Sequence, residues 1–214
     1  MKIGIIGKGT VGKAVYEGLQ YLGNEMCFFD PAYEGSKLED VLNAECVFIS
    51  VPTNQAPNGD CDTSIVEKVI NELNAAGYKG LVGIKSTVVP GTSEKLSAQY
   101  PNLRICSVPE FLRAKSALAD FMYNHDLLVI GSNREEDFDM IKEIHGNLPK
   151  AVSCVKPAEA EVVKYFNNVN CNFLKMSHDK LYIQFSYFLA PTGALSEPNR
   201  SHPEQFGALL FVYI

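Results

Sequence analysis

The chain has 214 residues, a formal net charge of −6 and 46% hydrophobic residues. This length suits one domain with a sizeable core plus an appendage. Because the net charge is negative and no basic run is present, we expect no nucleic-acid partner. No segment reaches the roughly 20 apolar residues of a membrane-spanning helix, so we also expect no membrane partner.

Cysteine usage indicates a reducing compartment. The six cysteines show neither Cys-x-x-Cys nor paired spacing: Cys27, Cys46, Cys61, Cys106, Cys154 and Cys171. This arrangement argues against a zinc site and against a disulfide framework. Since the N-terminus reads as a core strand rather than a signal peptide, we expect a cytoplasmic protein without bound metal.

The N-terminal residues predict a phosphate-binding turn. Residues 2–6 form an apolar run typical of a buried strand, and three glycines follow in G-x-G-x-x-G spacing. A tight turn needs a residue without Cβ, a pyrophosphate must approach the backbone closely, and a helix N-terminus then faces the phosphate charge. The expected cofactor contacts in this turn are Gly7, Gly9, Thr10, Val11 and Gly12.

A second strand over residues 26–29 leads to Asp30. A carboxylate at the end of this strand can hydrogen-bond the ribose diol of an adenosine. The same negative charge would repel the 2′-phosphate of NADP. We therefore expect the cofactor to be NAD.

Strands and helices alternate along the rest of the chain. Further apolar strands are expected at 45–51, 81–85, 103–108 and 127–131, and helices at 63–76, 92–99, 134–146 and 157–175. Ser64 and Glu67 predict a capping box for the helix at 63–76, and Gly77 predicts its end.

This alternation predicts an α/β fold with a doubly wound, Rossmann-like parallel sheet, followed by a helix and an atypical C-terminal tail. We place an NAD-binding domain at 1–156, a connecting helix at 157–176 and a divergent or truncated tail at 177–214.

Four further motifs follow the glycine fingerprint in a fixed order. They are V-P-T at 51–53, S-T-V-V-P-G-T at 86–92, P-E-F-L at 109–112 and A-E-V-V-K-Y-F-N-N at 160–168. With the fingerprint, they resemble the UDP-glucose/GDP-mannose dehydrogenase family over about residues 1–176. The resemblance implies oxidation of the C6 alcohol of a nucleotide sugar to a carboxylate with two NAD per product, with UDP-glucose as the default substrate.

The resemblance also implies roles for particular residues. Thr87 matches a threonine near the nicotinamide and a catalytic water, and Glu110 matches a general base for hydrolysis, whose pKa burial would raise. Without the resemblance, Ser86 and Thr87 read as a helix cap and Glu110 as a surface acid. The implied cofactor contacts in these loops are Val51, Pro52, Thr53, Ser86 and Thr87.

Lys164 and Asn168 lie four residues apart on the predicted helix, so they share one face and can converge on the substrate oxygen. An ammonium and an amide there would stabilise a developing alkoxide. The alternative is a solvated polar stripe that also includes Glu161 and Lys175. The resemblance further implies that this helix begins a homodimer interface.

Three departures from the family pattern affect the expected activity. Ala114 replaces a second glutamate, the family's P-D-R-I-V-I-G reads H-D-L-L-V-I-G at 125–131, and the cysteine block G-x-G-G-x-C-x-x-K-D is absent. That cysteine forms the thiohemiacetal and thioester of the four-electron oxidation. Cys171 could replace it or be an inert helix cysteine.

Three functions therefore remain open. The first is a nucleotide-sugar 6-dehydrogenase, and the second is an NAD-binding module without turnover. The third is a two-electron hydroxyacid dehydrogenase, since Lys164-x-x-Asn167-Asn168 also resembles the catalytic helix of that class. The ordered motifs favour the first family, while the absent cysteine block leads us to expect little uronate formation by this polypeptide alone.

Overall fold

A computed structural model describes the backbone of residues 1–173 and the side chains of residues 1–168. The chain divides into two units, Met1–Lys164 and Tyr165–Ile214. The first unit contains the whole sheet. Of the second, the described part is the end of the last helix, and the predicted tail at 177–214 lies outside the described residues.

The first unit alternates strands and helices as the sequence predicts. The strands are β1 (Lys2–Ile6), β2 (Glu25–Phe29), β3 (Cys46–Ile49), β4 (Leu81–Ile84), β5 (Arg104–Ser107), β6 (Leu127–Gly131) and β7 (Ala151–Val155). The α-helices are α1 (Thr10–Tyr21), α2 (Ser64–Ala75), α3 (Thr92–Gln99), α4 (Ala117–Tyr123), α5 (Glu135–His145) and α6 (Pro157–Phe173). Two short 3₁₀ helices are η1 (Leu38–Val41) and η2 (Ala114–Ser116).

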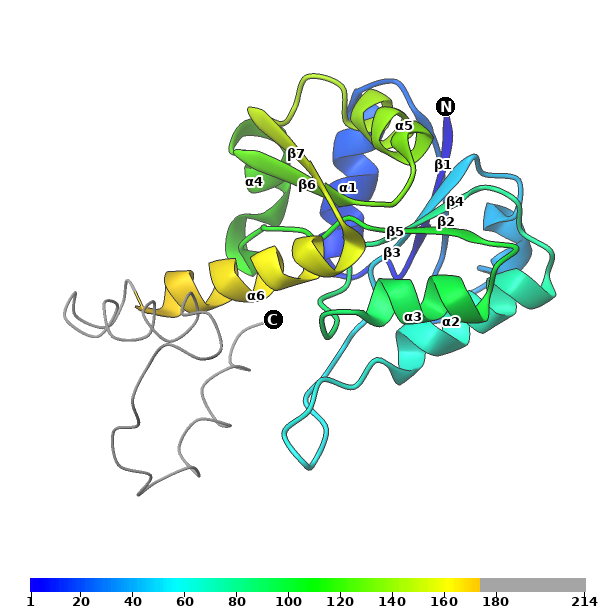
Figure 1. Cartoon of the computed structure of the whole chain (residues 1–214). Coiled ribbons are helices and arrows are strands. Elements are labelled where there is room, and N and C mark those ends of the chain that lie inside the picture. Colours follow the sequence, from blue (N-terminus) through cyan, green and yellow to red (C-terminus); the bar gives the residue numbers. More distant parts are fainter. Residues whose placement is uncertain (174–214) are drawn as a thin grey trace. The chain divides into compact units, whose positions relative to one another are not determined.

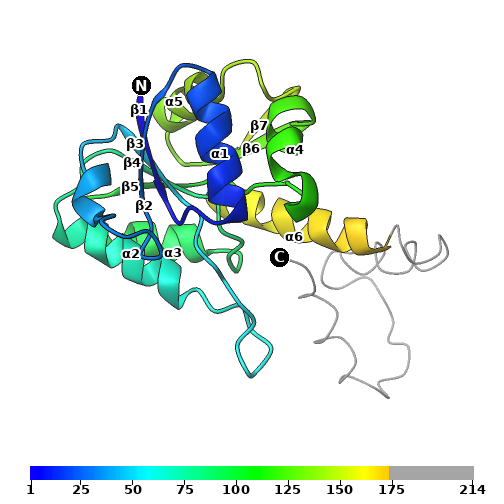
Figure 2. The same cartoon turned by 180° about the vertical axis from the view of Figure 1, so that it is seen from behind.

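Helices cover both faces of the sheet because its strands are apolar on both sides. In β3, Val47 and Ile49 pack into one core with α2 and α3, while Cys46 and Phe48 pack into another with α1, α4 and α5. Figures 1 and 2 show α2 with α3 on one face, and α1 with α4 on the other. This is the predicted Rossmann-like α/β fold.

The strand order is β2-β1-β3-β4-β5-β6-β7. The order reverses at β1, because β2 lies on one side of it and β3 on the other. In open α/β sheets a ligand crevice forms at such a reversal, outside the carboxyl ends of the strands. The glycine turn after β1 and the V-P-T loop after β3 meet there.

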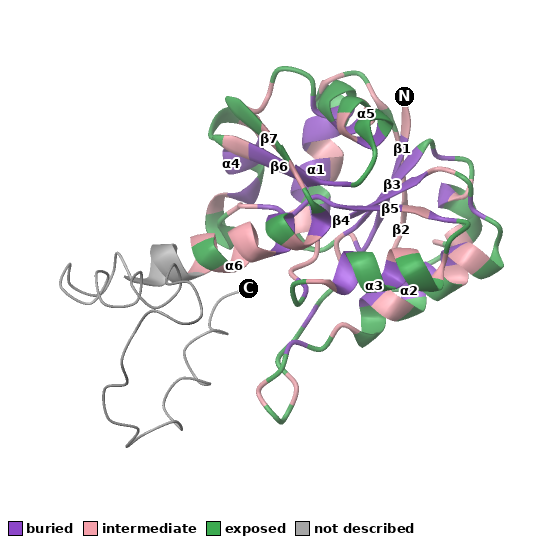
Figure 3. Ribbon diagram, viewed as in Figure 1, coloured by how far each residue is buried: buried purple, intermediate pink, exposed green. Residues whose placement is uncertain are grey.

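The far end of the sheet differs from the prediction in two ways. The expected parallel sheet has one exception at β6, which runs antiparallel to β5 and pairs with it through Ser107 and Gly131. In addition, β7, which was not predicted, pairs parallel with β6. Figure 3 shows β7 as a largely exposed edge strand, although four of its five residues are hydrophobic.

Local capping of α2 differs from the prediction as well. The predicted Ser64–Glu67 capping box is wrong, since the N-cap is Thr63, whose hydroxyl donates to Glu67 over 3.1 Å. Asp62 accepts the Ser64 N–H over 2.9 Å. The predicted stop at Gly77 is confirmed by its φ of 71°, a left-handed conformation that suits glycine.

Within the described residues, no helix has the length and apolar character needed to cross a membrane.

Candidate functional site

The glycine turn after β1 has the geometry of a phosphate cradle. Gly7 has a φ of 87°, and its N–H donates to the carbonyl of Phe29 over 2.9 Å. A Cβ on Gly7 would lie 2.6 Å from the Ser50 carbonyl oxygen, and one on Gly12 would collide with the Gly7 carbonyl. A Cβ on Gly9 would meet no protein atom within 4 Å. Gly7 and Gly12 are therefore required for the turn itself, whereas Gly9 leaves its backbone open to a ligand.

The N-terminus of α1 is suited to binding an anion. The helix begins at Thr10 after the N-cap Gly9, has no side-chain cap and carries no acidic residue in its first turn. Its first N–H groups thus have no intrahelical or side-chain cap partner and can bind phosphate oxygens.

Asp30 is fixed beside this turn at the end of β2. One carboxylate oxygen accepts the Lys8 N–H over 2.7 Å, and the other accepts the Ala32 N–H over 2.9 Å. The residue is half-buried. Its carboxylate is therefore held at the edge of the glycine turn by main-chain donors, which is where a ribose diol would be recognised.

The V-P-T and S-T-V loops are joined to each other. Ser86 Oγ donates to the carbonyl of Val51 over 2.7 Å, and the Thr87 carbonyl accepts from the Cys61 thiol over 3.6 Å. Thr53 is buried, and Pro52 is exposed. The helix-cap alternative for Ser86 and Thr87 is wrong, because α3 begins only at Thr92 with Gly91 as its N-cap.

A buried ion pair connects the ends of β4 and β5. Lys85 Nζ lies 2.9 Å from Glu110 Oε2, and the two side chains are 0% and 3% exposed. The other Glu110 oxygen accepts the Phe111 N–H over 3.1 Å. The surface-acid alternative for Glu110 is therefore wrong.

The expected rise in the pKa of Glu110 is also wrong. Burial alone would raise this pKa, but the positive charge of Lys85 and the hydrogen bonds to the carboxylate lower it overall. Glu110 is thus an ionised carboxylate at neutral pH.

Two buried histidines lie near this ion pair. The ring centroids of His125 and His145 are 6.0 Å apart, and His125 lies 5.0 Å from the Phe121 ring. Burial lowers the pKa of His125, with the charge of Glu110 opposing, and burial also lowers that of His145 well below its usual value. Both imidazoles are therefore neutral, so Lys85 provides the positive charge that balances Glu110.

Glu161 attaches α6 to the start of α3. Its carboxylate accepts the Gly91 N–H over 2.6 Å, and the Ser93 N–H and hydroxyl over 2.9 and 2.6 Å. At 2% exposure, Glu161 does not belong to the solvated stripe that was the alternative for this helix. One turn further along α6, Lys164 Nζ lies 5.5 Å from the ring centroid of Phe111. Phe111 directly follows Glu110 in the chain.

Asn168 lies in the second unit, and its convergence with Lys164 on a substrate stays a prediction. The side chain of Cys171 and the whole of Lys175 lie outside the described residues.

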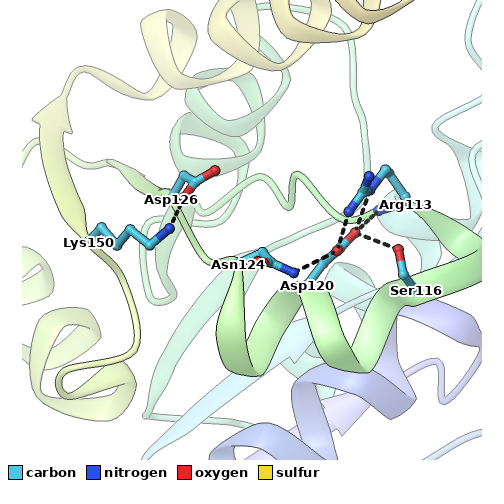
Figure 4. Close-up of polar contacts among 6 residues, drawn as sticks. All are labelled: Arg113, Ser116, Asp120, Asn124, Asp126 and Lys150. Carbon is cyan, nitrogen blue, oxygen red and sulfur yellow. Dashed lines mark hydrogen bonds and ion pairs between the residues drawn. The ribbon is translucent and has the colours of Figure 1, made fainter.

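Figure 4 shows the contacts that hold the segment after P-E-F-L. Arg113 donates to Asp120 through Nε and Nη2 over 2.9 and 2.7 Å, and the Ser116 hydroxyl donates over 2.9 Å. The hydrogen bonds from Arg113 hold the pKa of Asp120 far below its usual range. Nearby, Lys150 pairs with Asp126 over 2.6 Å at the surface.

Lys85 and the roles of Glu161 and Asp120 were not predicted from the sequence. Lys85 carried a usable signal, because it is a charged residue that directly follows the apolar strand of β4. Glu161 and Asp120 carried none, since an acidic residue on a helix is usually solvated.

Together, the glycine turn, the acid after β2 and the strand reversal define a Rossmann-type dinucleotide-binding domain. The sequence model of the UDP-glucose/GDP-mannose dehydrogenase family, NAD-binding domain, matches residues 33–149, more than half of the 214 residues. The chain belongs to this family, as its motifs predict, and its cofactor is NAD.

Individual relatives agree with this assignment. A UDP-glucose 6-dehydrogenase of Rickettsia bellii is 30% identical over 209 residues, which cover 78% of this chain and 48% of the relative. The structure of a UDP-glucose dehydrogenase from Pyrobaculum islandicum has a TM-score of 0.70 at 30% identity and covers 78% of this chain and 49% of that one.

A GDP-mannose dehydrogenase structure from Pseudomonas aeruginosa, a ternary complex, shares the fold with a TM-score of 0.68 at 23% identity. The match covers 87% of this chain and 52% of the GDP-mannose dehydrogenase chain. The chain spans about half the length of the curated relatives it matches.

Proposed function

We propose that this chain takes part in the NAD-dependent oxidation of the C6 alcohol of a nucleotide sugar, with UDP-glucose as the default substrate. The observation that carries this proposal is the position of three motifs. V-P-T, S-T-V and P-E-F-L follow the adjacent strands β3, β4 and β5, at the same edge as the glycine turn. Residues at this edge can contact both NAD and a substrate.

The glycine turn and Asp30 would bind the adenosine and pyrophosphate, while Val51, Pro52, Thr53 and Ser86 would line the path toward the nicotinamide. Bound NAD supplies the hydride acceptor. Lys164 and Asn168 would donate hydrogen bonds to the alcohol oxygen and stabilise negative charge on it.

Thr87 and Glu110 are the residues proposed to handle water and protons. Glu110 can accept a proton only in its ionised form, and the charge of Lys85 maintains that form. The carboxylate accepts one hydrogen bond on each oxygen, from Lys85 and from the Phe111 N–H, so each oxygen keeps a lone pair that could accept from a water molecule.

The cysteine chemistry of the second oxidation has no assigned residue in the described part of the chain. Burial raises the pKa of Cys46 and Cys106, which makes both thiols poor nucleophiles. We therefore expect this polypeptide to bind NAD but to form UDP-glucuronate at a rate far below about 1 s⁻¹, the lower end of common kcat values.

The test is NADH formation by the purified chain with NAD and UDP-glucose, followed by identification of the sugar product. Slow NADH formation that Lys164→Ala abolishes would support the proposal. Two NADH per uronate at an ordinary kcat would contradict the expected lack of thiol chemistry, and Cys171→Ser would then identify the nucleophile.

The same assay separates the alternatives. Lys164, Asn167 and Asn168 also fit the K-x-x-N-N helix of hydroxyacid dehydrogenases. NADH formed from small hydroxy acids but not from UDP-glucose would favour that class. NAD binding without turnover of any of these substrates would favour a binding module.

A homodimer through residues 157–176 also stays a prediction, which sedimentation would test.

A further inference from the structure

Lys8, the residue between the first two glycines, places its ammonium on aromatic rings. Its Nζ lies 3.7 Å from the ring centroid of Tyr16, 3.8 Å from that of Phe28 and 6.0 Å from that of Tyr33. The rings pack edge to face, with Tyr16 and Phe28 5.9 Å apart and Phe28 and Tyr33 5.3 Å apart. These three rings form what we call the Lys8 cage. A cation over aromatic faces is attracted by their quadrupoles.

The backbone of the same residue lies at the candidate ribose site. The Lys8 N–H donates to Asp30 Oδ2 over 2.7 Å, so the Lys8 side chain starts next to that carboxylate. Tyr33 also contacts this loop, since its hydroxyl donates to the Lys8 carbonyl over 3.5 Å. With four methylene groups, an unrestrained lysine at this position could bring its ammonium to Asp30 or to a phosphate on the ribose.

We propose that the Lys8 cage is a specificity-determining element that preserves the preference of this site for NAD over NADP. The cage holds the positive charge of Lys8 against Tyr16 and Phe28, so that in this proposal it pairs neither with Asp30 nor with a 2′-phosphate. It thereby leaves the charge of Asp30 uncompensated, and that charge repels the phosphate. The proposal rests on the assignment of Asp30 to the ribose.

Two routes would weaken the preference if the cage were opened. A released ammonium could pair with Asp30 and cancel its repulsion, or it could pair directly with the 2′-phosphate. Both routes favour NADP relative to NAD, so the direction of the effect does not depend on which one operates.

Isothermal titration of the whole chain with NAD and with NADP tests this, using the ratio of the two Kd values. Tyr16→Leu removes one ring of the cage, and Tyr16→Phe is the matched control that keeps it. We expect Tyr16→Leu to lower the preference for NAD by about fivefold, the size of one cation–π contact, and Tyr16→Phe to leave it unchanged. Thermal melting checks folding, and Phe28→Leu is the second cage variant if Tyr16→Leu unfolds.

Lys8→Ala, alone and combined with Tyr16→Leu, completes a double-mutant cycle. In the intact cage it should change the preference by less than about twofold, because the charge is already confined. Added to Tyr16→Leu, it should restore the preference. An unchanged ratio in the cage variants, or a large change from Lys8→Ala alone, would overturn the proposal.

Asp30→Ala distinguishes failure of the cage from failure of the site beneath it. If Asp30→Ala lowers the preference and the cage variants do not, the cage proposal alone is wrong. If Asp30→Ala has no effect, the ribose assignment fails, and the cage proposal fails with it.

Discussion

The two halves of the sheet's carboxyl edge can be compared directly, because both contain motifs of the same family. At the ends of β1 and β2, the candidate NAD site consists largely of main-chain groups, with Asp30 held by two N–H donors. At the ends of β4 and β5, the polar groups are buried side chains, led by the pair of Lys85 and Glu110. Glycine geometry thus determines the first half and buried charge the second, so substitutions in the two halves should fail in different ways.

The largest expected effect is from Lys85→Met, which would leave the Glu110 carboxylate buried without its partner. Losing one member of a buried ion pair costs about 3–5 kcal/mol. Urea unfolding should show a decrease of this size in the free energy of unfolding. The double variant Lys85→Met/Glu110→Gln should recover most of it, and equal losses in the single and double variants would show that the pair is not coupled.

Glu161→Ala tests whether α6 is held to α3 by this carboxylate. It would leave the N–H groups of Gly91 and Ser93 without their acceptor, at a cost of about 2–3 kcal/mol. Glu94→Ala is the matched control, because Glu94 is an exposed acid in the first turn of α3 and should contribute less than about 1 kcal/mol. Similar losses from both substitutions would contradict the assigned role of Glu161.

The glycines of the cofactor half provide a matched pair. Gly12→Ala forces a Cβ against the Gly7 carbonyl and should cost about 1–3 kcal/mol of stability. Gly9→Ala has space for its Cβ, so it should leave the unfolding midpoint unchanged while weakening NAD binding by about tenfold or more. Destabilisation by Gly9→Ala with intact NAD binding would reverse the roles of the two positions.

The smallest expected effect is a pH dependence confined to the side-chain half. The pKa of His145 is far below its unfolded value of about 6.5, so the unfolded state takes up this proton first as the pH falls. Stability should therefore be complete above about pH 6.5 and decline below it, by at most about 1.4 kcal/mol per pH unit for each histidine. His145→Gln should flatten this decline, as measured by urea unfolding near pH 5 and pH 7.5. An unchanged slope would exclude His145 as its source.

The comparison also explains what the sequence could predict. The turn after β1, the helix α1 and Asp30 follow from local spacing, because glycine geometry and strand–helix periodicity operate over a few residues. Pairing of Lys85 with Glu110 joins positions 25 residues apart, and nothing in either segment specifies the partner. The pKa of Glu110 was therefore predicted in the wrong direction, from burial without the neighbouring charge.

Sheet topology shows the same limit. The antiparallel direction of β6 depends on how the chain returns through α4, and no short motif encodes that path. The edge strand β7, by contrast, has four hydrophobic residues among the five of Ala-Val-Ser-Cys-Val, so its apolar content could have identified it although it is mostly exposed.

The most direct test of the account is to locate bound NAD on the whole chain by backbone amide chemical-shift mapping. The account predicts that NAD shifts the amides of Gly7 to Gly12, of residues next to Asp30 and of the V-P-T loop, and leaves those of β7 unchanged. Shifts that avoid the glycine turn and Asp30 would contradict it.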